Sequence, residues 1–322
     1  LPASVATGLD FTFNSVSIGK GANSVANNTV LGEGALDAAV TGNNNTAIGK
    51  NALTANTSGS SNTAIGKSAL ADTTTGENNT AVGATALHFN TTGNNNTALG
   101  NRALQIATAS NNTAIGGLAL GVNTTGTQNV AVGSNALDAN TTGLANTAVG
   151  HQSLTANTTG NYNVAVGGAS LTANTTASDN TAMGYGALNA NTSGANNTGL
   201  GRLSLLSNTT ASNNTAVGYG SLRLNTTGTG QVAVGTEALI SNTTGTINTA
   251  VGHNSMHDNT TGQGNVALGR NTLFNNETAN HNVAVGYDAV FSNTTGADLV
   301  GVGHQALYNS TTASNNTAVG KN

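Results

Sequence analysis

The chain has 322 residues and a mass of 31.5 kDa, so small side chains dominate and little bulk is available to fill a globular interior. It carries 8 Lys and Arg against 12 Asp and Glu, and the net charge of -4 gives no basic surface for nucleic acid and no polybasic patch for a membrane. Cysteine is absent, which excludes disulfides, thiolate catalysis and cysteine metal sites together.

The amino-terminal segment, residues 1–13, departs from the pattern of the rest of the chain. It contains Pro2, the one proline, and an alternating stretch that includes Phe11 and Phe13. Alternating stretches of this kind add to open strand edges. We therefore predict that residues 1–13 either cap the first coil or dock onto the end of another copy, with Phe11 and Phe13 as the docking side chains.

The remaining chain, residues 14–322, is one continuous repeat array built on the string Asn-Thr-Ala-Ile/Val-Gly. Nineteen glycines, here called anchor glycines, mark successive copies, and 16 of the 18 intervals between them are 17 residues long. The anchors are Gly19, Gly32, Gly49, Gly66, Gly83, Gly100, Gly116, Gly133, Gly150, Gly167, Gly184, Gly201, Gly218, Gly235, Gly252, Gly269, Gly286, Gly303 and Gly320. A unit of this length, rich in Gly, Asn and Thr, is too short for two packed helices. The predicted fold is all-β, a parallel β-solenoid with about one coil per 17 residues.

Two short strands and a turn are expected in each coil. The residues one and three before the anchor are β-branched or aliphatic, as at Thr46 and Ile48, so we expect this strand to bury that face. The fourth residue after the anchor is almost always Leu, as at Leu53, and predicts a second buried strand. Between the strands runs Asn-Thr-Thr-Gly, a sequence typical of turns. The resulting interior is too thin for a substrate cavity.

The residue two before each anchor is nearly always Ala, although strand alternation then points it outward. An outward position held to a small residue predicts a second surface packed against it, and another copy of the chain is the simplest candidate. The predicted interface residues are Ala47, Ala64, Ala81, Ala98, Ala131, Ala148, Ala165, Ala182, Ala216 and Ala233. The sequence also allows the reverse orientation, with Ala inside and Thr and Val outside a monomeric rod.

The stretch 17–26, followed by residues 29–32, resembles the head repeats of trimeric autotransporter adhesins of the YadA type. The later 17-residue coils resemble the lengthened variant found in adhesin heads and in phage-like tail-fibre proteins. This resemblance covers the whole chain. It implies a left-handed β-roll, a homotrimer with three chains side by side, and display outside a cell or virion.

Catalytic chemistry is not indicated, because carboxylates are scattered singly and no pair recurs at a productive spacing. His151, His253 and His304 each follow an anchor, at a position that Lys, Arg and Tyr also fill, so they are interpreted as variable exposed residues. We expect no catalytic, cofactor-binding or metal-binding residues, and hence a non-enzymatic protein.

Ten Asn-Thr-Thr strings are formal N-glycosylation acceptors, about one per coil. The acceptor residues are Asn90, Asn123, Asn140, Asn157, Asn174, Asn208, Asn225, Asn242, Asn259 and Asn293. The alternative, which we favour, is a ladder of stacked Asn amides that bond along the column. The paired threonines also suggest a minor hypothesis, an array that orders water and binds ice.

These observations predict a segment of an extracellular structural fibre or adhesin that provides reach and attachment to a host-cell or matrix receptor. A phage-type tail fibre is the alternative function. The repeat runs at full strength to residues 316–320, so we also expect either further chain beyond residue 322 or end-to-end polymerisation.

Overall fold

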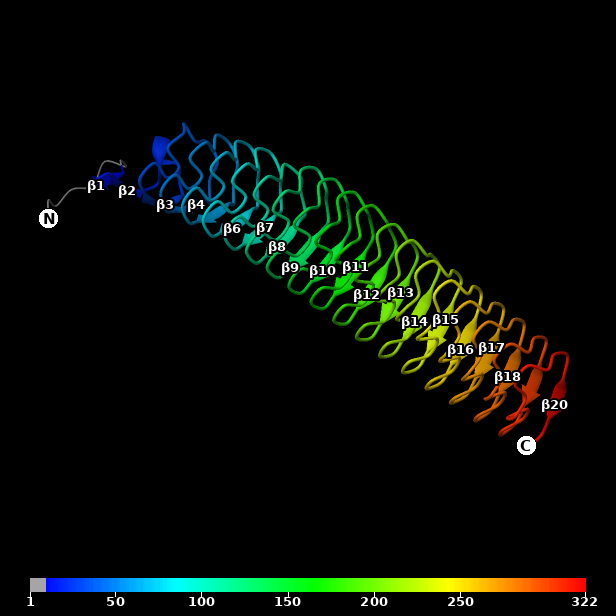
Figure 1. Cartoon of the computed structure of the whole chain (residues 1–322). Helices are drawn as coiled ribbons and strands as arrows, with labels where there is room; N and C mark the ends of the chain where they lie inside the picture. The colour runs from blue at the N-terminus through cyan, green and yellow to red at the C-terminus, as the bar shows by residue number, and fades with distance from the viewer. Residues whose placement is uncertain (1–9) are drawn as a thin grey trace. The chain divides into compact units, whose positions relative to one another are not determined.

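The computed structural model describes residues 10–322, and its contacts divide the chain into two compact units, Leu1–Asn161 and Tyr162–Asn322. Each unit is a stack of coils that follow one another in chain order (Figure 1). The first unit is unit 1 and the second is unit 2. The predicted all-β parallel solenoid with a 17-residue repeat is confirmed.

An antiparallel hairpin precedes the coils of unit 1. Strand β1 (Phe11–Phe13) pairs with β2 (Val16–Gly19), and β2 pairs antiparallel with β3 (Thr29–Gly32). A short 3-10 helix, η1 (Ala22–Ser24), follows β2. The Asp10 carboxylate accepts hydrogen bonds from the backbone N–H groups of Lys20 and Gly21, both at 2.6 Å. Phe11 and Phe13 thus lie in a strand paired within the chain, with both side chains exposed; residues 1–9 of the predicted segment lie outside the described residues.

From β3 onward the strands of unit 1 pair in parallel and in register, one strand per coil. Strand β2, which the sequence boundary at residue 14 assigned to the array, therefore belongs with the hairpin. The remaining strands of unit 1 are β4 (Thr46–Ile48), β5 (Thr63–Ile65), β6 (Thr80–Val82), β7 (Thr97–Leu99), β8 (Thr113–Ile115), β9 (Val130–Val132) and β10 (Thr147–Val149).

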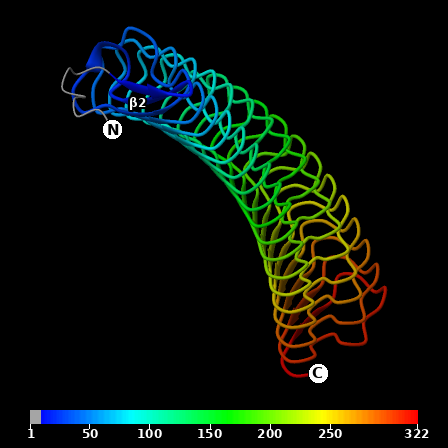
Figure 2. The same ribbon diagram turned by 90° about the vertical axis from the view of Figure 1, so that its left-hand side faces the viewer.

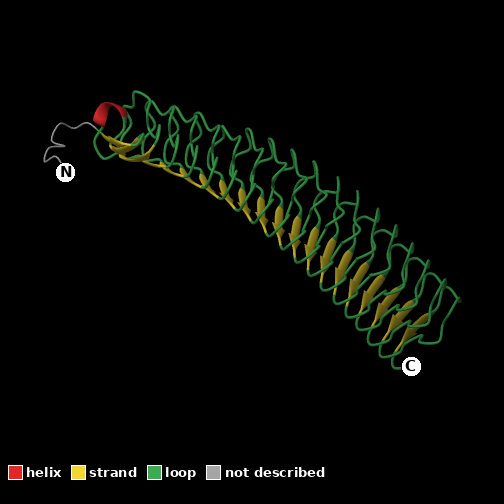
Figure 3. Cartoon of the chain, turned by 60° about the vertical axis from the view of Figure 1, so that its left-hand side comes forward, coloured by secondary structure: helices red, strands yellow, loops and turns green. Residues whose placement is uncertain are grey.

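Unit 2 repeats this arrangement, with parallel in-register pairs throughout. Its strands are β11 (Val164–Val166), β12 (Thr181–Met183), β13 (Thr198–Leu200), β14 (Thr215–Val217), β15 (Val232–Val234), β16 (Thr249–Val251), β17 (Val266–Leu268), β18 (Val283–Val285), β19 (Val300–Val302) and β20 (Thr317–Val319). In each unit the strands form one row and loops make up the rest of every coil (Figures 2 and 3).

The orientation expected for this strand is wrong. The ten alanines predicted to face outward are all fully buried, whereas Thr46, Ile48 and their equivalents lie at the surface. A methyl group built on Gly199, which replaces Ala in its coil, lies 3.4 Å from Cγ of Leu188. The interior is thus only as wide as one Leu and one methyl group, and this width, not a neighbouring chain, keeps the position small.

The second predicted strand is also absent from the described coils, although its Leu is buried as expected. Leu53 has a φ of 52°, and both Ala52 and Leu53 are fully buried. Two successive inward side chains are incompatible with strand alternation. The left-handed conformation turns Leu inward after Ala, and the Leu53 N–H donates to the carbonyl of Ala69 in the next coil at 3.0 Å.

Candidate functional site

The strand row exposes a surface of nearly constant composition, here called the strand face: the residues one and three before each anchor. The first of these positions holds only Ile, Val, Leu or Met, and the second only Thr or Val. Ile65 is 37% exposed and Met183 is 46% exposed, so these side chains reach solvent in the single chain. No charged residue occupies the strand face.

The Asn-Thr-Thr asparagines lie inside the coils and form the favoured amide ladder. Nδ2 of Asn140 donates to Oδ1 of Asn123 at 2.8 Å and to the carbonyl of Gly143 at 3.0 Å. The same pair of contacts holds Asn208, whose Nδ2 reaches Oδ1 of Asn191 at 2.8 Å. All ten formal acceptors are fully buried, so their side chains are not available for N-glycosylation in the folded chain.

A second ladder follows the Asn found four residues before most anchors. Oδ1 of Asn45 accepts the backbone N–H of Asn62 at 3.0 Å, and its Nδ2 donates to the carbonyl of Gly59 at 2.9 Å. Gln231 replaces Asn in this column and makes equivalent bonds to Asn248 and Gly245. Both ladders satisfy buried polar groups by joining each coil to the next.

The paired threonines of the turn differ from one another. The hydroxyl of the first donates to the carbonyl of its counterpart in the next coil, as from Thr141 to Thr158 at 3.0 Å and from Thr226 to Thr243 at 3.0 Å. The second, for example Thr142, is exposed. In the array suggested for ice binding, the hydroxyl of the first Thr of each pair therefore already donates a hydrogen bond to the next coil.

A further surface, here called the post-anchor edge, consists of the residues one, two, five and six positions after each anchor. Side chains at the fifth position contact the backbone at the second position of the preceding coil. Nδ1 of His88 lies 3.0 Å from the carbonyl oxygen of Ser68, and Nδ2 of Asn189 donates to the carbonyl of Ala169 at 2.9 Å. The second and fifth positions thus lie on one side of the coil, and the first and sixth positions adjoin them in the sequence.

The post-anchor edge holds all 8 Lys and Arg residues of the chain. They are Lys20, Lys50, Lys67, Arg102, Arg202, Arg223, Arg270 and Lys321. Five of the 6 histidines and seven of the ten Phe and Tyr residues lie there as well, including the predicted variable residues His151, His253 and His304. The signal in the sequence is that every Lys and Arg lies one, two or five residues after an anchor glycine.

Aromatic rings on the edge of unit 2 stack from coil to coil. His257, Phe274, Phe291 and Tyr308 form one column, with successive ring centroids 4.8, 5.1 and 5.1 Å apart. In a neighbouring column the guanidinium of Arg270 lies over the ring of Tyr287 at 5.7 Å, and His304 stacks on Tyr287 at 5.4 Å. These contacts join adjacent coils. Phe274, Phe291 and Tyr287 each have a neighbouring ring or guanidinium on both faces.

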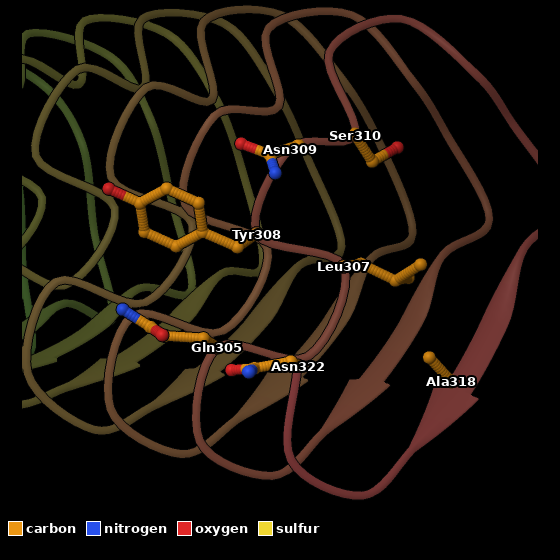
Figure 4. A pocket seen from close by; sticks show the side chains of 7 residues that line it. All are labelled: Gln305, Leu307, Tyr308, Asn309, Ser310, Ala318 and Asn322. Atoms are coloured by element: carbon orange, nitrogen blue, oxygen red, sulfur yellow. The ribbon is translucent and has the colours of Figure 1, made fainter.

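Two pockets among residues 10–322 lie over the first coil of unit 1 and over the last coil of unit 2. In the second of these, Leu307 and Ala318 point toward one another across the coil interior, and Gln305 and Tyr308 lie at its rim (Figure 4). This pocket is the interior of the last coil of unit 2, lined by Leu307 and Ala318.

Within the described residues, no three His, Asp or Glu side chains gather as metal ligands, and no helix is long and apolar enough to cross a membrane. No family model and no curated protein matches the chain. The strand face and the post-anchor edge are thus the surfaces that bear on its function.

Proposed function

We propose that the chain is a non-enzymatic segment of an extracellular structural fibre or adhesin, in which three copies pack through their strand faces. The observation that carries this proposal is the contrast between two exposed surfaces. The strand face holds an aliphatic residue or Met and a Thr or Val in every coil, whereas the first position of the post-anchor edge varies among Gly, Ser, Lys, Arg, Tyr, His and other residues. A constant, charge-free exposed surface is typical of one that packs against another protein surface.

The available area supports this assignment. Each three-residue strand presents about 50 Å², from a coil spacing of ~4.8 Å and a rise of ~3.3 Å per residue. The eight strands β3–β10 and the ten strands β11–β20 then present about 900 Å² per copy, which a trimer divides between two neighbours. The three copies together would bury about 2,700 Å², compared with roughly 1,600 Å² for a standard interface between two partners. The three-fold arrangement, the left-handed coil and the extracellular location rest on the resemblance to YadA-type head repeats. A phage-type tail fibre has the same structural role, with receptor binding as its function.

A mass measurement in solution tests this proposal. Light scattering of the wild-type chain should give three times the monomer mass. The double variant Val217→Lys/Val251→Lys should give the monomer mass, because burying two Lys charges without ionic partners would destabilise the interface. Thr227→Lys/Thr244→Lys, which adds the same charges at exposed turn positions, is the matched control and should stay trimeric. A monomeric wild-type chain, or a trimer unaffected by the strand-face charges, would contradict the proposal.

A further inference from the structure

The distribution of charge in unit 2 separates the post-anchor edge from the other surfaces. Unit 2 carries four Lys and Arg against six Asp and Glu. All four basic residues lie on the edge, together with His253, His257 and His304, whereas Asp179, Glu277 and Asp298 lie elsewhere on the coils. The edge is therefore the one place in unit 2 where cationic side chains gather.

Two arginines of this edge are held by tyrosines and remain available to a ligand. The guanidinium of Arg202 lies 5.8 Å from the ring centroid of Tyr219, and that of Arg270 lies 5.7 Å from the centroid of Tyr287. Both arginines are exposed, and within residues 10–322 neither makes an ion pair with a carboxylate. An Arg placed over a ring keeps its planar N–H fork free to bind a carboxylate or sulfate in bidentate fashion.

Most carboxylates of the same edge already have partners. Asp258 lies 2.6 Å from Nδ1 of His257, and Asp288, which is buried, accepts a hydrogen bond from Asn271 at 3.0 Å. Glu237 is the one further acidic residue on this part of the edge. The two arginines are thus not neutralised by the groups that share their surface.

The repeat sets the spacing of these groups. Arg202 and Arg270 occupy the same position four coils apart, which is about 19 Å along the stack at ~4.8 Å per coil. His253 lies between them, one coil before Arg270, and His304 follows two coils after Arg270. A ligand that engages this row must be a linear polymer with anionic groups at intervals along its length.

We propose that the post-anchor edge of unit 2, from Arg202 to His304, binds an acidic polysaccharide through Arg202 and Arg270. Single-stranded nucleic acid is disfavoured because base recognition needs free ring faces, and here the faces of Phe274 and Phe291 are covered by their neighbours in the column. Neutral glycans lack the anionic groups that the arginines recognise. This inference rests on the proposed function, since it names the surface through which the fibre would attach.

Binding of the full chain to defined polymers tests the inference. Dextran sulfate and polygalacturonate should bind in calorimetric titrations, and neutral dextran should not. The variant Arg202→Gln/Arg270→Gln should weaken both interactions by at least about tenfold, since each lost charged hydrogen bond costs about 1.5–3 kcal/mol. Lys50→Gln/Lys67→Gln, which removes two cations from the same edge of unit 1, is the matched control and should change affinity by less than about twofold.

Three results would overturn the inference: unchanged affinity in the arginine variant, equal binding of neutral dextran, or equal binding of a single-stranded oligonucleotide. Arg202→Lys/Arg270→Lys keeps the charge but loses the planar fork, so it should bind more weakly than the wild type and more tightly than the Gln variant. Circular dichroism and light scattering of each variant check folding and assembly. An arginine variant that assembles normally but fails to bind supports the post-anchor edge as the site. A monomeric wild-type chain that still binds these polymers would contradict the proposed function and leave this inference standing.

Discussion

Asn56 illustrates how closely each residue depends on its counterparts in adjacent coils. Its Nδ2 donates to the carbonyl of Gly59 at 2.9 Å, but its buried Oδ1 has no hydrogen-bond partner. The reason is that the next residue in the column is Thr73, whose hydroxyl donates to the carbonyl of Asn90 at 2.7 Å. A single substitution in one coil therefore leaves an unsatisfied acceptor in the coil before it.

Thr73→Asn should repair this gap in the ladder. The new Nδ2 would donate to Oδ1 of Asn56, and the new Oδ1 would accept from Nδ2 of Asn90, as in the uninterrupted column. We expect the free energy of unfolding to rise by about 0.5–1.5 kcal/mol, as measured by chemical denaturation. Thr75→Asn, at an exposed turn position of the same coil, is the control and should have little effect. A variant no more stable than this control would show that the ladder bonds contribute little.

At the scale of the element, each coil balances backbone strain against contacts with its neighbours. Leu137 adopts a φ of 53°, a conformation that costs an L-residue about 1–2 kcal/mol. The same residue is fully buried, and its N–H donates to the carbonyl of Ser153 at 3.0 Å. The strain is retained because it places the one large apolar side chain of the coil in the interior, where burial stabilises by about 1.5–3 kcal/mol.

Leu137→Ala should lower the free energy of unfolding by about 2–5 kcal/mol, because the thin interior cannot collapse around the cavity. Each coil contacts only those beside it, so the loss of hydrogen-exchange protection should be concentrated in residues 116–154. Leu224→Ala removes the same side chain from an exposed position of the post-anchor edge, outside the proposed interface, and should have a smaller effect. Equal effects of the two substitutions would contradict the assignment of inside and outside.

For the molecule as a whole, stability is a sum of similar terms between adjacent coils, since no apolar cluster larger than the Leu and Ala columns is buried in the described chain. The Gln231 coil shows that the columns tolerate local variation while the register is kept. The register, rather than the identity of any one coil, is thus the property that the fold requires.

Deletion of residues 219–235, one complete coil of unit 2, should leave the fold intact, because it joins Gly218 to Thr236 with every column in register. Circular dichroism per residue and the cooperativity of thermal unfolding should be nearly unchanged. Deletion of residues 219–227 removes half a coil, brings Asn and Leu columns out of line, and should abolish cooperative unfolding of this region. If the two deletions behave alike, stability does not depend on stacked columns.

The fold class, the 17-residue coil and the buried Leu column follow from the sequence alone, because the spacing of Gly49, Gly66 and their equivalents leaves few other structures. The amide ladder also followed, since identical asparagines recur at one position. The Lys and Arg residues of the post-anchor edge are recognisable in the sequence because each lies one, two or five residues after an anchor, but only the fold places their side chains on one surface. Which strand face lies inside was decided by the tertiary structure. Thr, Ala and Ile suit either face of a strand, and the space opposite Leu, wide enough for one methyl group, determines that Ala lies within.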